Sequence, residues 1–101
     1  MGSRHDTKHD TKTKERLERP RQYKVLLHND DYTTMEFVVW LLEGVFQHTS
    51  AGATRVMLQI HKAGVGVAGV YSRDVAETRV AQVRELAETE GHPLQCTMEP
   101  E

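Results

Sequence analysis

The distribution of apolar side chains along the chain constrains the fold most, because it leaves material for only one small core. Apart from Pro20, residues 1–20 contain just two apolar side chains, Met1 and Leu17. Such a segment cannot bury enough apolar surface to offset the entropy lost on ordering. We therefore expect residues 1–20 to form a disordered N-terminal tail and residues 21–101 to form one small domain with a single core.

The spacing of apolar residues after the tail predicts six elements in the order β-α-α-β-α-β. Segments that alternate or run apolar as strands do are 22–28, 64–72 and 93–99. Segments with helical spacing begin at Thr33, at Ser50 and at Arg73. Gly91 and Pro93 end the last of these. We predict a single small α+β domain in which a three-stranded antiparallel sheet packs against three helices.

The helical segments also carry predictions about caps and faces. Thr33 stands three residues before Glu36, which is capping-box spacing, and Ser50 fits an N-cap of the second helix. Trp40 falls on the charged face of the first helix, so we expect it to be substantially exposed. The expected core stripe of that helix is Met35, Val38, Val39, Leu42, Val45 and Phe46. The expected inward residues of the last helix are Val75, Ala76, Val80, Val83 and Ala87.

The stretch Asn29-Asp30-Asp31 at the edge of the first helix has two interpretations from the residues alone. Asparagine and aspartate before a helix commonly serve as turn and cap residues. Together with His61 they are also a set of hydrogen-bond acceptors, which a protonated amine with three N–H donors requires. An apolar pocket beside them would then receive a side chain attached next to that amine. An enzyme using Asp31 and His61 as acid and base is a third, weaker interpretation.

Composition argues against several other classes of function. The part after the tail has seven basic and eleven acidic residues, which is unlike a nucleic-acid-binding surface. No apolar run approaches the roughly 20 residues of a membrane span, and no signal peptide precedes the domain. The single cysteine, Cys96, fits a reducing, cytoplasmic compartment. His5 and His9 lie in a tail without helical pattern, so we predict neither a metal site nor a cofactor.

Four stretches of the chain together resemble the ClpS family, the adaptor proteins of the bacterial ClpAP protease. They are "YKVLLHNDDYTTMEFVV", "VMLQIHKAGVGVAGVY", "DVAETRVAQV" and "HPLQCTME", and they extend from about Tyr23 to Glu99. The resemblance implies a non-enzymatic adaptor that recognises N-degrons: it would bind proteins whose first residue is Leu, Phe, Tyr or Trp and deliver them to the unfoldase.

The resemblance also implies which residues bind the peptide. Asn29, Asp31 and His61 would contact the α-amino group, with Asp30 as a weaker candidate. The apolar pocket and its rim would be formed by Thr33, Met35, Val38, Met57, Ile60 and Leu94.

Two further expectations concern the partner protease. Asp74 and Arg79 match the positions through which ClpS proteins dock on the N-terminal domain of the ClpA unfoldase. The tail matches the variable N-terminal extension that the family uses for delivery. The alternatives that remain are a scaffold domain of the same fold that does not read N-termini, and the small acid–base enzyme.

Overall fold

The central strand β1 (Gln22–His28) organises a fold in which the predicted order of elements is confirmed. The computed structural model describes residues 20–101, so the predicted tail lies outside the described residues except for Pro20. The elements after β1 are α2 (Met35–Gly44), α3 (Ser50–Ala63), β2 (Val65–Ser72), α4 (Arg73–Thr89) and β3 (Gln95–Pro100). The α+β class and the three antiparallel strands also agree with the prediction.

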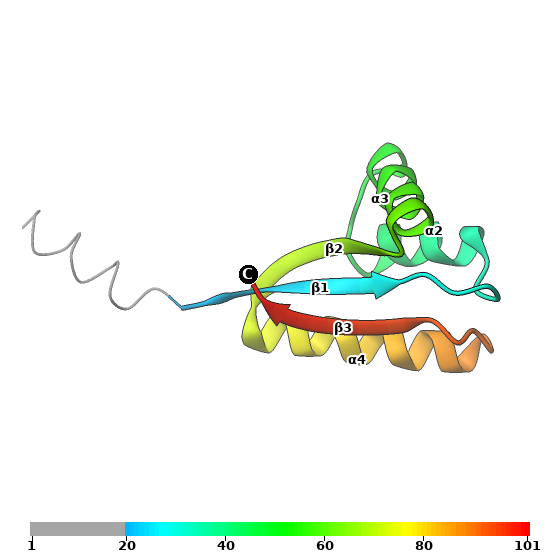
Figure 1. The fold of residues 1–101 in the computed structure, drawn as a ribbon. Coiled ribbons are helices and arrows are strands. Elements are labelled where there is room, and N and C mark those ends of the chain that lie inside the picture. Colours follow the sequence, from blue (N-terminus) through cyan, green and yellow to red (C-terminus); the bar gives the residue numbers. More distant parts are fainter. Residues whose placement is uncertain (1–19) are drawn as a thin grey trace, which may run out of the picture.

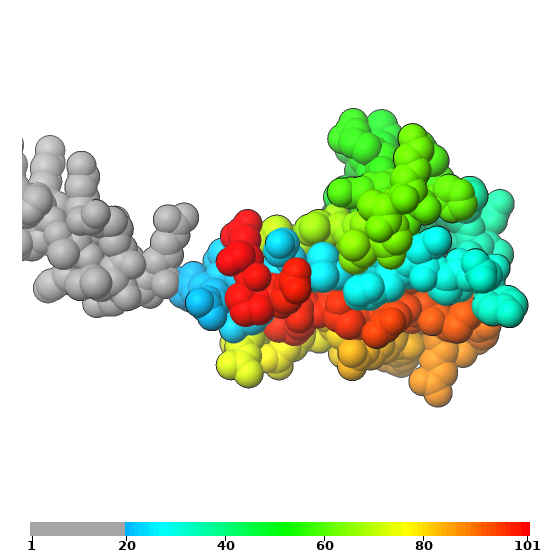
Figure 2. Space-filling model, viewed as in Figure 1, coloured from blue at the N-terminus to red at the C-terminus, as the bar shows by residue number. Residues whose placement is uncertain are grey.

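The sheet has the strand order β2-β1-β3, so β1 is hydrogen-bonded on both sides. The register against β2 shifts between Val25, which lies opposite Gly69, and Leu26, which lies opposite Val67. Such an irregularity bends a strand and increases its twist. Figure 1 and Figure 2 show that β1 ends beside α2 and α3. The loop that follows β1 is therefore held at that end of the molecule.

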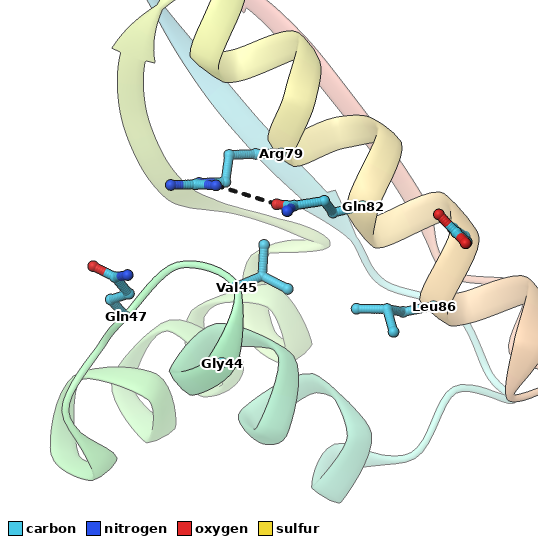
Figure 3. Close-up of a pocket in the computed structure, with 7 residues that line it drawn as sticks. Gly44, Val45, Gln47, Arg79, Gln82 and Leu86 are labelled. Atoms are coloured by element: carbon cyan, nitrogen blue, oxygen red, sulfur yellow. Dashed lines mark hydrogen bonds between the residues drawn. The ribbon is translucent and has the colours of Figure 1, made fainter.

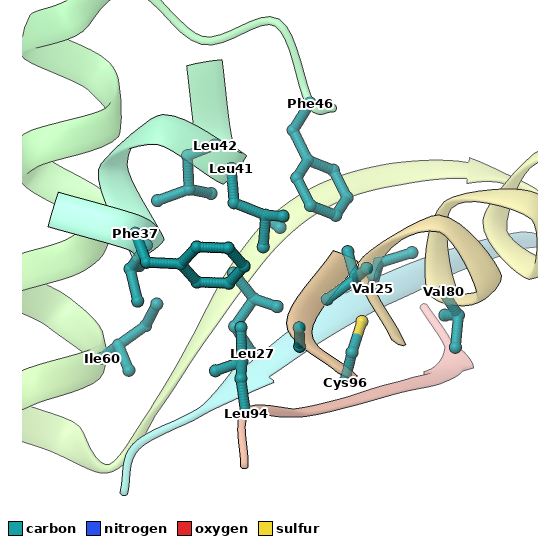
Figure 4. Close-up of a cluster of buried hydrophobic side chains, with 14 of the residues drawn as sticks. Val25, Leu27, Phe37, Leu41, Leu42, Phe46, Ile60, Val80, Leu94 and Cys96 are labelled. Atoms are coloured by element: carbon teal, nitrogen blue, oxygen red, sulfur yellow. The ribbon is translucent and has the colours of Figure 1, made fainter. Parts of the chain in front are cut away.

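One face of the sheet is buried and the other is polar, as the alternation of β1 predicts. Val25 and Leu27 are fully buried, and α4 packs against all three strands. Figure 4 shows these side chains in one cluster with residues from α2, α4 and β3. On the opposite face Lys24 Nζ lies 3.9 Å from Glu99 Oε1, and His28 Nε2 lies 2.8 Å from Thr97 Oγ1. These cross-strand pairs fix the register of β1 against β3.

The helix caps differ from the prediction by one residue at two sites. Thr34, not Thr33, is the N-cap of α2, and its hydroxyl accepts the Phe37 N–H at 3.1 Å. The hydroxyl of Thr33 is unavailable because it donates to Asp30. Thr49, not Ser50, caps α3 by accepting the Gly52 N–H at 3.1 Å. In each case the cap is the residue with extended backbone just outside the helix.

The buried faces of α2 and α4 also differ from the prediction. The buried side chains of α2 are Phe37, Val38, Leu41 and Leu42, so Phe37 and Leu41 were missed. Met35 is half exposed because it opens the first turn, beyond the part of α2 that packs on the core. In α4, Val75 is exposed although it was predicted to face inward. Trp40 is 53% exposed, which confirms the prediction for that residue.

The two neighbouring residues at the start of α3 provide a test of the cap assignment. We expect Thr49→Ala to lower the free energy of unfolding by about 1 kcal/mol, because it leaves a helix N–H without its acceptor. Ser50→Ala is the matched control and should cost less than about 0.5 kcal/mol, since it removes only a surface hydrogen bond to Glu43. Urea denaturation measures both values. A larger loss for Ser50→Ala would show that Ser50 is the cap.

Candidate functional site

The loop after β1 is folded around the carboxylate of Asp30. Its Oδ1 accepts the N–H groups of Tyr32 at 2.8 Å and Thr33 at 2.7 Å. Its Oδ2 accepts the Thr33 hydroxyl at 2.7 Å. An aspartate that bonds its own following backbone is a standard way to fix a tight turn. Asp30 is therefore the turn residue of the loop, whereas the neighbouring Asp31 is exposed.

The surroundings of Asp30 lower its pKa from the ordinary value of 3.8. Partial burial raises the pKa, but the hydrogen bonds from Thr33 and Tyr32 and the nearby His92 lower it and outweigh burial. All of these lowering effects favour the charged carboxylate. At neutral pH Asp30 therefore carries its charge and holds the loop closed.

A backbone hydrogen bond joins this loop to the end of α3. The Asn29 N–H donates to the Gly64 carbonyl at 2.9 Å. Gly64 is the C-cap of α3, with a left-handed φ of 87°, and its own N–H closes the last turn on the Ile60 carbonyl at 2.9 Å. His61 lies in that last turn. The bond therefore brings Asn29 and its neighbours next to His61, although they are about 30 residues apart in the sequence.

A cavity of about 240 Å³ opens where the loop, α2 and α3 meet. Nine of the predicted peptide-binding residues line it: Asn29, Asp30, Asp31, Thr33, Met35, Val38, Met57, Ile60 and His61. Val38 and Ile60 also belong to the buried core, so the apolar wall of the cavity is continuous with the core. The structure does not bring Leu94 to this cavity. Leu94 is buried among core side chains, close to Leu27 in Figure 4.

The lining combines two chemistries. The loop and His61 supply carboxylate, amide and imidazole groups that accept hydrogen bonds. The helices supply Met35, Val38, Met57 and Ile60, which are apolar. This combination suits a ligand with an amine at one end and an apolar group close to it. Within residues 20–101, no group of three or more His, Cys, Asp or Glu side chains is arranged to hold a metal ion.

A larger hollow, of about 460 Å³, lies between α4 and the end of α2. Figure 3 shows Arg79 and Gln82 of α4 facing Gly44 and Val45, with Arg79 Nη1 donating to Gln82 Oε1 at 3.2 Å. The Arg79 guanidinium also lies 5.7 Å from the centre of the Tyr71 ring. Asp74 is exposed in the first turn of α4 and does not line this hollow. The larger hollow is lined by polar, charged and apolar groups together, and it lacks the cluster of acceptor groups found in the smaller cavity.

The comparisons with known proteins identify the family. The model of the family described as ATP-dependent Clp protease adaptor protein ClpS matches residues 18–97. The chain belongs to the ClpS family. The ClpS adapter protein of Desulfatibacillum aliphaticivorans is 57% identical over 91 residues, which cover 90% of this chain and 88% of that protein. That of Nitratidesulfovibrio vulgaris is 60% identical over 80 residues, which cover 79% and 80% of the two chains.

A solved ClpS structure has the same fold. It is ClpS2 of Agrobacterium tumefaciens bound to L-phenylalaninamide, with a TM-score of 0.79 and 44% identity. The match covers 82% of this chain and all of that one. Because ClpS proteins are described as adaptors of the Clp protease, the chain is an adaptor and not an enzyme. This rules out the acid–base interpretation of Asp31 and His61. Within the described residues, no helix is both long and apolar enough to cross a membrane.

Sequence reasoning missed the role of Gly64. The sequence pattern placed Gly64 at the start of the strand segment 64–72, whereas it ends α3 and accepts the hydrogen bond from Asn29. A glycine directly after the last helical turn is the usual signal for a left-handed C-cap. The signal was present in the sequence, but the contact with Asn29 depends on how the chain folds.

The two adjacent aspartates should differ in their effect on stability. Asp30→Ala should lower the free energy of unfolding at pH 7 by about 1–2 kcal/mol, since two backbone N–H groups lose their acceptor. Because the pKa of Asp30 is lower in the folded than in the unfolded protein, its stabilising effect is complete above the unfolded value. The effect is lost as the pH falls through the folded value. The gap between wild type and Asp30→Ala should therefore narrow below about pH 4.

The matched control for this prediction is Asp31→Ala. Asp31 is exposed, so this substitution should change stability by less than about 0.5 kcal/mol. Denaturant titrations of the three proteins between pH 7 and pH 3 measure the difference. Equal losses for the two alanine variants would contradict the assignment of Asp30 as the turn residue.

Proposed function

We propose that this ClpS adaptor binds proteins whose first residue is bulky and hydrophobic, namely Leu, Phe, Tyr or Trp, and delivers them to the ClpA unfoldase of the ClpAP protease. The observation that carries the proposal is that acceptor groups and an apolar wall meet in the cavity between the loop, α2 and α3. An N-terminal residue is the part of a protein that combines a free amine with a side chain one atom away. The cavity matches that arrangement.

In this proposal the α-ammonium group occupies the polar end of the cavity. Asn29, Asp31 and His61 accept its three N–H donors, and Asp30 acts mainly by holding the loop. The α-amino group has a pKa of about 7.7–8.0, so it is largely charged at neutral pH. Hydrogen bonds from a charged donor to a carboxylate are stronger than neutral ones. The free amine therefore distinguishes a true N-terminus from an internal residue.

The side chain of the first residue occupies the apolar end. Met35 and Met57 lie at its sides, and Val38 and Ile60 belong to the core behind it. The related ClpS2 structure contains L-phenylalaninamide, a ligand with a free α-amine and a benzyl side chain. That ligand has the chemistry for which the cavity of this chain is suited, which supports the proposal.

Delivery to the protease requires a second surface. We assign docking on the N-terminal domain of ClpA to Asp74 and Arg79, which lie five residues apart on α4. Asp74 is exposed, and the half-buried Arg79 borders the hollow between α4 and the end of α2. Residues 1–20 are proposed to assist delivery rather than binding. The proposed partners place this activity in the cytoplasm.

The remaining alternative is a ClpS-fold domain that binds a partner without reading N-termini. Such a domain would not distinguish a peptide that begins with Phe from its N-acetylated form. Acetylation removes the charge of the amine and leaves the side chain unchanged. Affinities for the two peptides therefore separate the two functions directly.

We expect Asp31→Ala to weaken binding of a peptide beginning with Phe by about tenfold or more, because a charge-assisted hydrogen bond is lost. N-acetylation of the peptide should weaken its binding to the wild type by a similar or larger factor. Glu88→Ala, an exposed carboxylate on α4, is the matched control and should bind as wild type does. Isothermal titration calorimetry measures the affinities. Unchanged affinity of Asp31→Ala would refute the assignment of Asp31.

Met35 should act as the residue that rejects side chains branched at Cβ. It lines the cavity next to the loop, so it lies close to the Cβ of a bound first residue. Ile and Val carry two heavy atoms on Cβ and are stiff about χ1, whereas Leu and Phe branch further out. Burial of such a side chain is worth about 1.5–3 kcal/mol, and a clash of that size would cancel it. The wild type should therefore bind peptides that begin with Ile or Val about tenfold or more weakly than those with Leu or Phe.

The Met35→Ala variant tests this role. It should accept Ile and Val while largely keeping its affinity for Leu and Phe. Leu58→Ala, an exposed apolar residue of α3 that does not line the cavity, is the control and should keep the wild-type preference. Fluorescence anisotropy with labelled peptides gives the ranking. Continued rejection of Ile and Val by Met35→Ala would assign the discrimination to another residue.

A further inference from the structure

Trp40 forms a ridge between two surface hollows that the proposed function does not use. The side chain is 53% exposed, which is unusual for so large an apolar group. One hollow, of about 330 Å³, is lined by Met35, Glu36, Val39, Trp40 and Glu43. The other, of about 370 Å³, is lined by Thr34, Glu36, Phe37, Trp40, Glu90 and His92. Trp40 and Glu36 thus belong to both.

The Trp40 indole packs against the buried ring of Phe37, which in turn packs against the half-buried His92. The ring centre of Phe37 lies 5.8 Å from that of Trp40, and the His92 ring packs on Phe37 at 4.4 Å. Phe37 is itself buried in the core. The Trp40 ring therefore packs on a buried neighbour, and its exposed part forms an aromatic platform on α2.

The charge around this platform has one sign. Glu36, Glu43 and Glu90 border the two hollows, and among the described residues neither hollow is lined by lysine or arginine. A cation over an indole face is attracted by the ring as well as by neighbouring carboxylates. The surface therefore favours a lysine or arginine side chain of a ligand.

The platform is continuous with the cavity proposed to bind the first residue of a substrate. Met35 lines both that cavity and the first Trp40 hollow, so only one side chain separates them. Trp40 follows Met35 by five residues, which is about 7.5 Å along the helix axis and about 140° around it. A chain that leaves the cavity must also pass around the helix, so about three to four residues of extended chain, at about 3.3–3.6 Å each, cover the path. A polypeptide held by its first residue must leave the cavity, and this path is within its reach.

We propose that Trp40, with Glu36 and Glu43, forms a second substrate contact that receives a lysine or arginine side chain about two to four residues after the N-terminal residue. This inference rests on the proposed function, because it extends the same binding site. It predicts that the adaptor ranks substrates by the residues that follow the first one. A second copy of this chain or its residues 1–19 would be competing occupants of the same surface.

The test uses full-length protein and a series of peptides that begin with Phe and continue with serine and glycine. Single lysines are placed at positions two, three, four or five. L-Phenylalaninamide, which has no following residues, is the minimal ligand. We expect lysine at one or two of these positions to tighten binding to wild type by about three- to fivefold relative to the serine peptide. Anisotropy competition assays measure these ratios.

The Trp40→Ala variant should lose the lysine preference and bind L-phenylalaninamide as wild type does. Trp40→Phe should keep part of the preference, since a smaller aromatic face remains. Leu58→Ala, an exposed apolar residue outside both hollows, should keep all of it. This pattern would assign the preference to the aromatic platform rather than to overall charge.

Four other outcomes would each contradict the second contact in a different way. If L-phenylalaninamide binds but lysine gives no advantage at any position, the second contact is refuted and the proposed function stands. If L-phenylalaninamide and all the peptides fail to bind wild type, both are refuted. A concentration-dependent dimer that Trp40→Ala abolishes, without a lysine preference, would assign the surface to a second copy. Increased iodide quenching of Trp40 after deletion of residues 1–19, without a lysine preference, would assign it to that segment.

Discussion

The hydrogen bond from the Asn29 N–H to the Gly64 carbonyl is the constraint on which the site depends. It joins the end of the central strand to the end of α3, and the next residue, Val65, already pairs with His28 in the sheet. Gly64 can adopt the φ of 87° that this junction requires because it has no Cβ, whereas this φ is strained for other residues. This backbone junction brings the acceptor groups of the loop next to the imidazole of His61. No hydrogen bond between their side chains is needed to keep them together.

Two adjacent aspartates in the loop have different tasks for a geometric reason. Asp30 points back over the turn, where it accepts three hydrogen bonds, and this leaves little acceptor capacity for a ligand. Asp31 is exposed at the cavity and is available to one. The residue that fixes the fold of the loop is therefore different from the residue that is free to contact a ligand. The bonds to Asp30 maintain the shape of the loop, while Asn29, Asp31 and His61 line the cavity and, in the proposed function, would accept hydrogen bonds from a ligand.

The sequence predicted those parts of the structure that depend on local pattern. The strands, the order of the elements and the exposure of Trp40 follow from alternation and helical spacing, which act over a few residues. The cap of α2 was placed wrongly because two adjacent threonines have nearly the same propensity, and only the bond from Thr33 to Asp30 decides between them. Nine site residues meet at one cavity, but the family resemblance led to them. Spacing alone left both a turn and an amine site open. The place of Leu94 in the cavity wall stays a prediction: it is buried in the same core cluster as the lining residues Val38 and Ile60, through three-dimensional contacts that no local pattern contains.

Helix α2 links the surfaces that an adaptor must use at the same time. Met35 and Val38, near its start, line the cavity proposed for the N-terminal residue, and Gly44, at its end, lines the hollow beside Arg79. Between them Phe37, Leu41 and Leu42 are buried, so the middle of the helix is held against the core. A short helix fixed in this way separates the two surfaces at a constant distance. In the proposed function, substrate and unfoldase would be bound at different residues and would not compete for them. The Trp40 platform lies on the exposed side of the same helix.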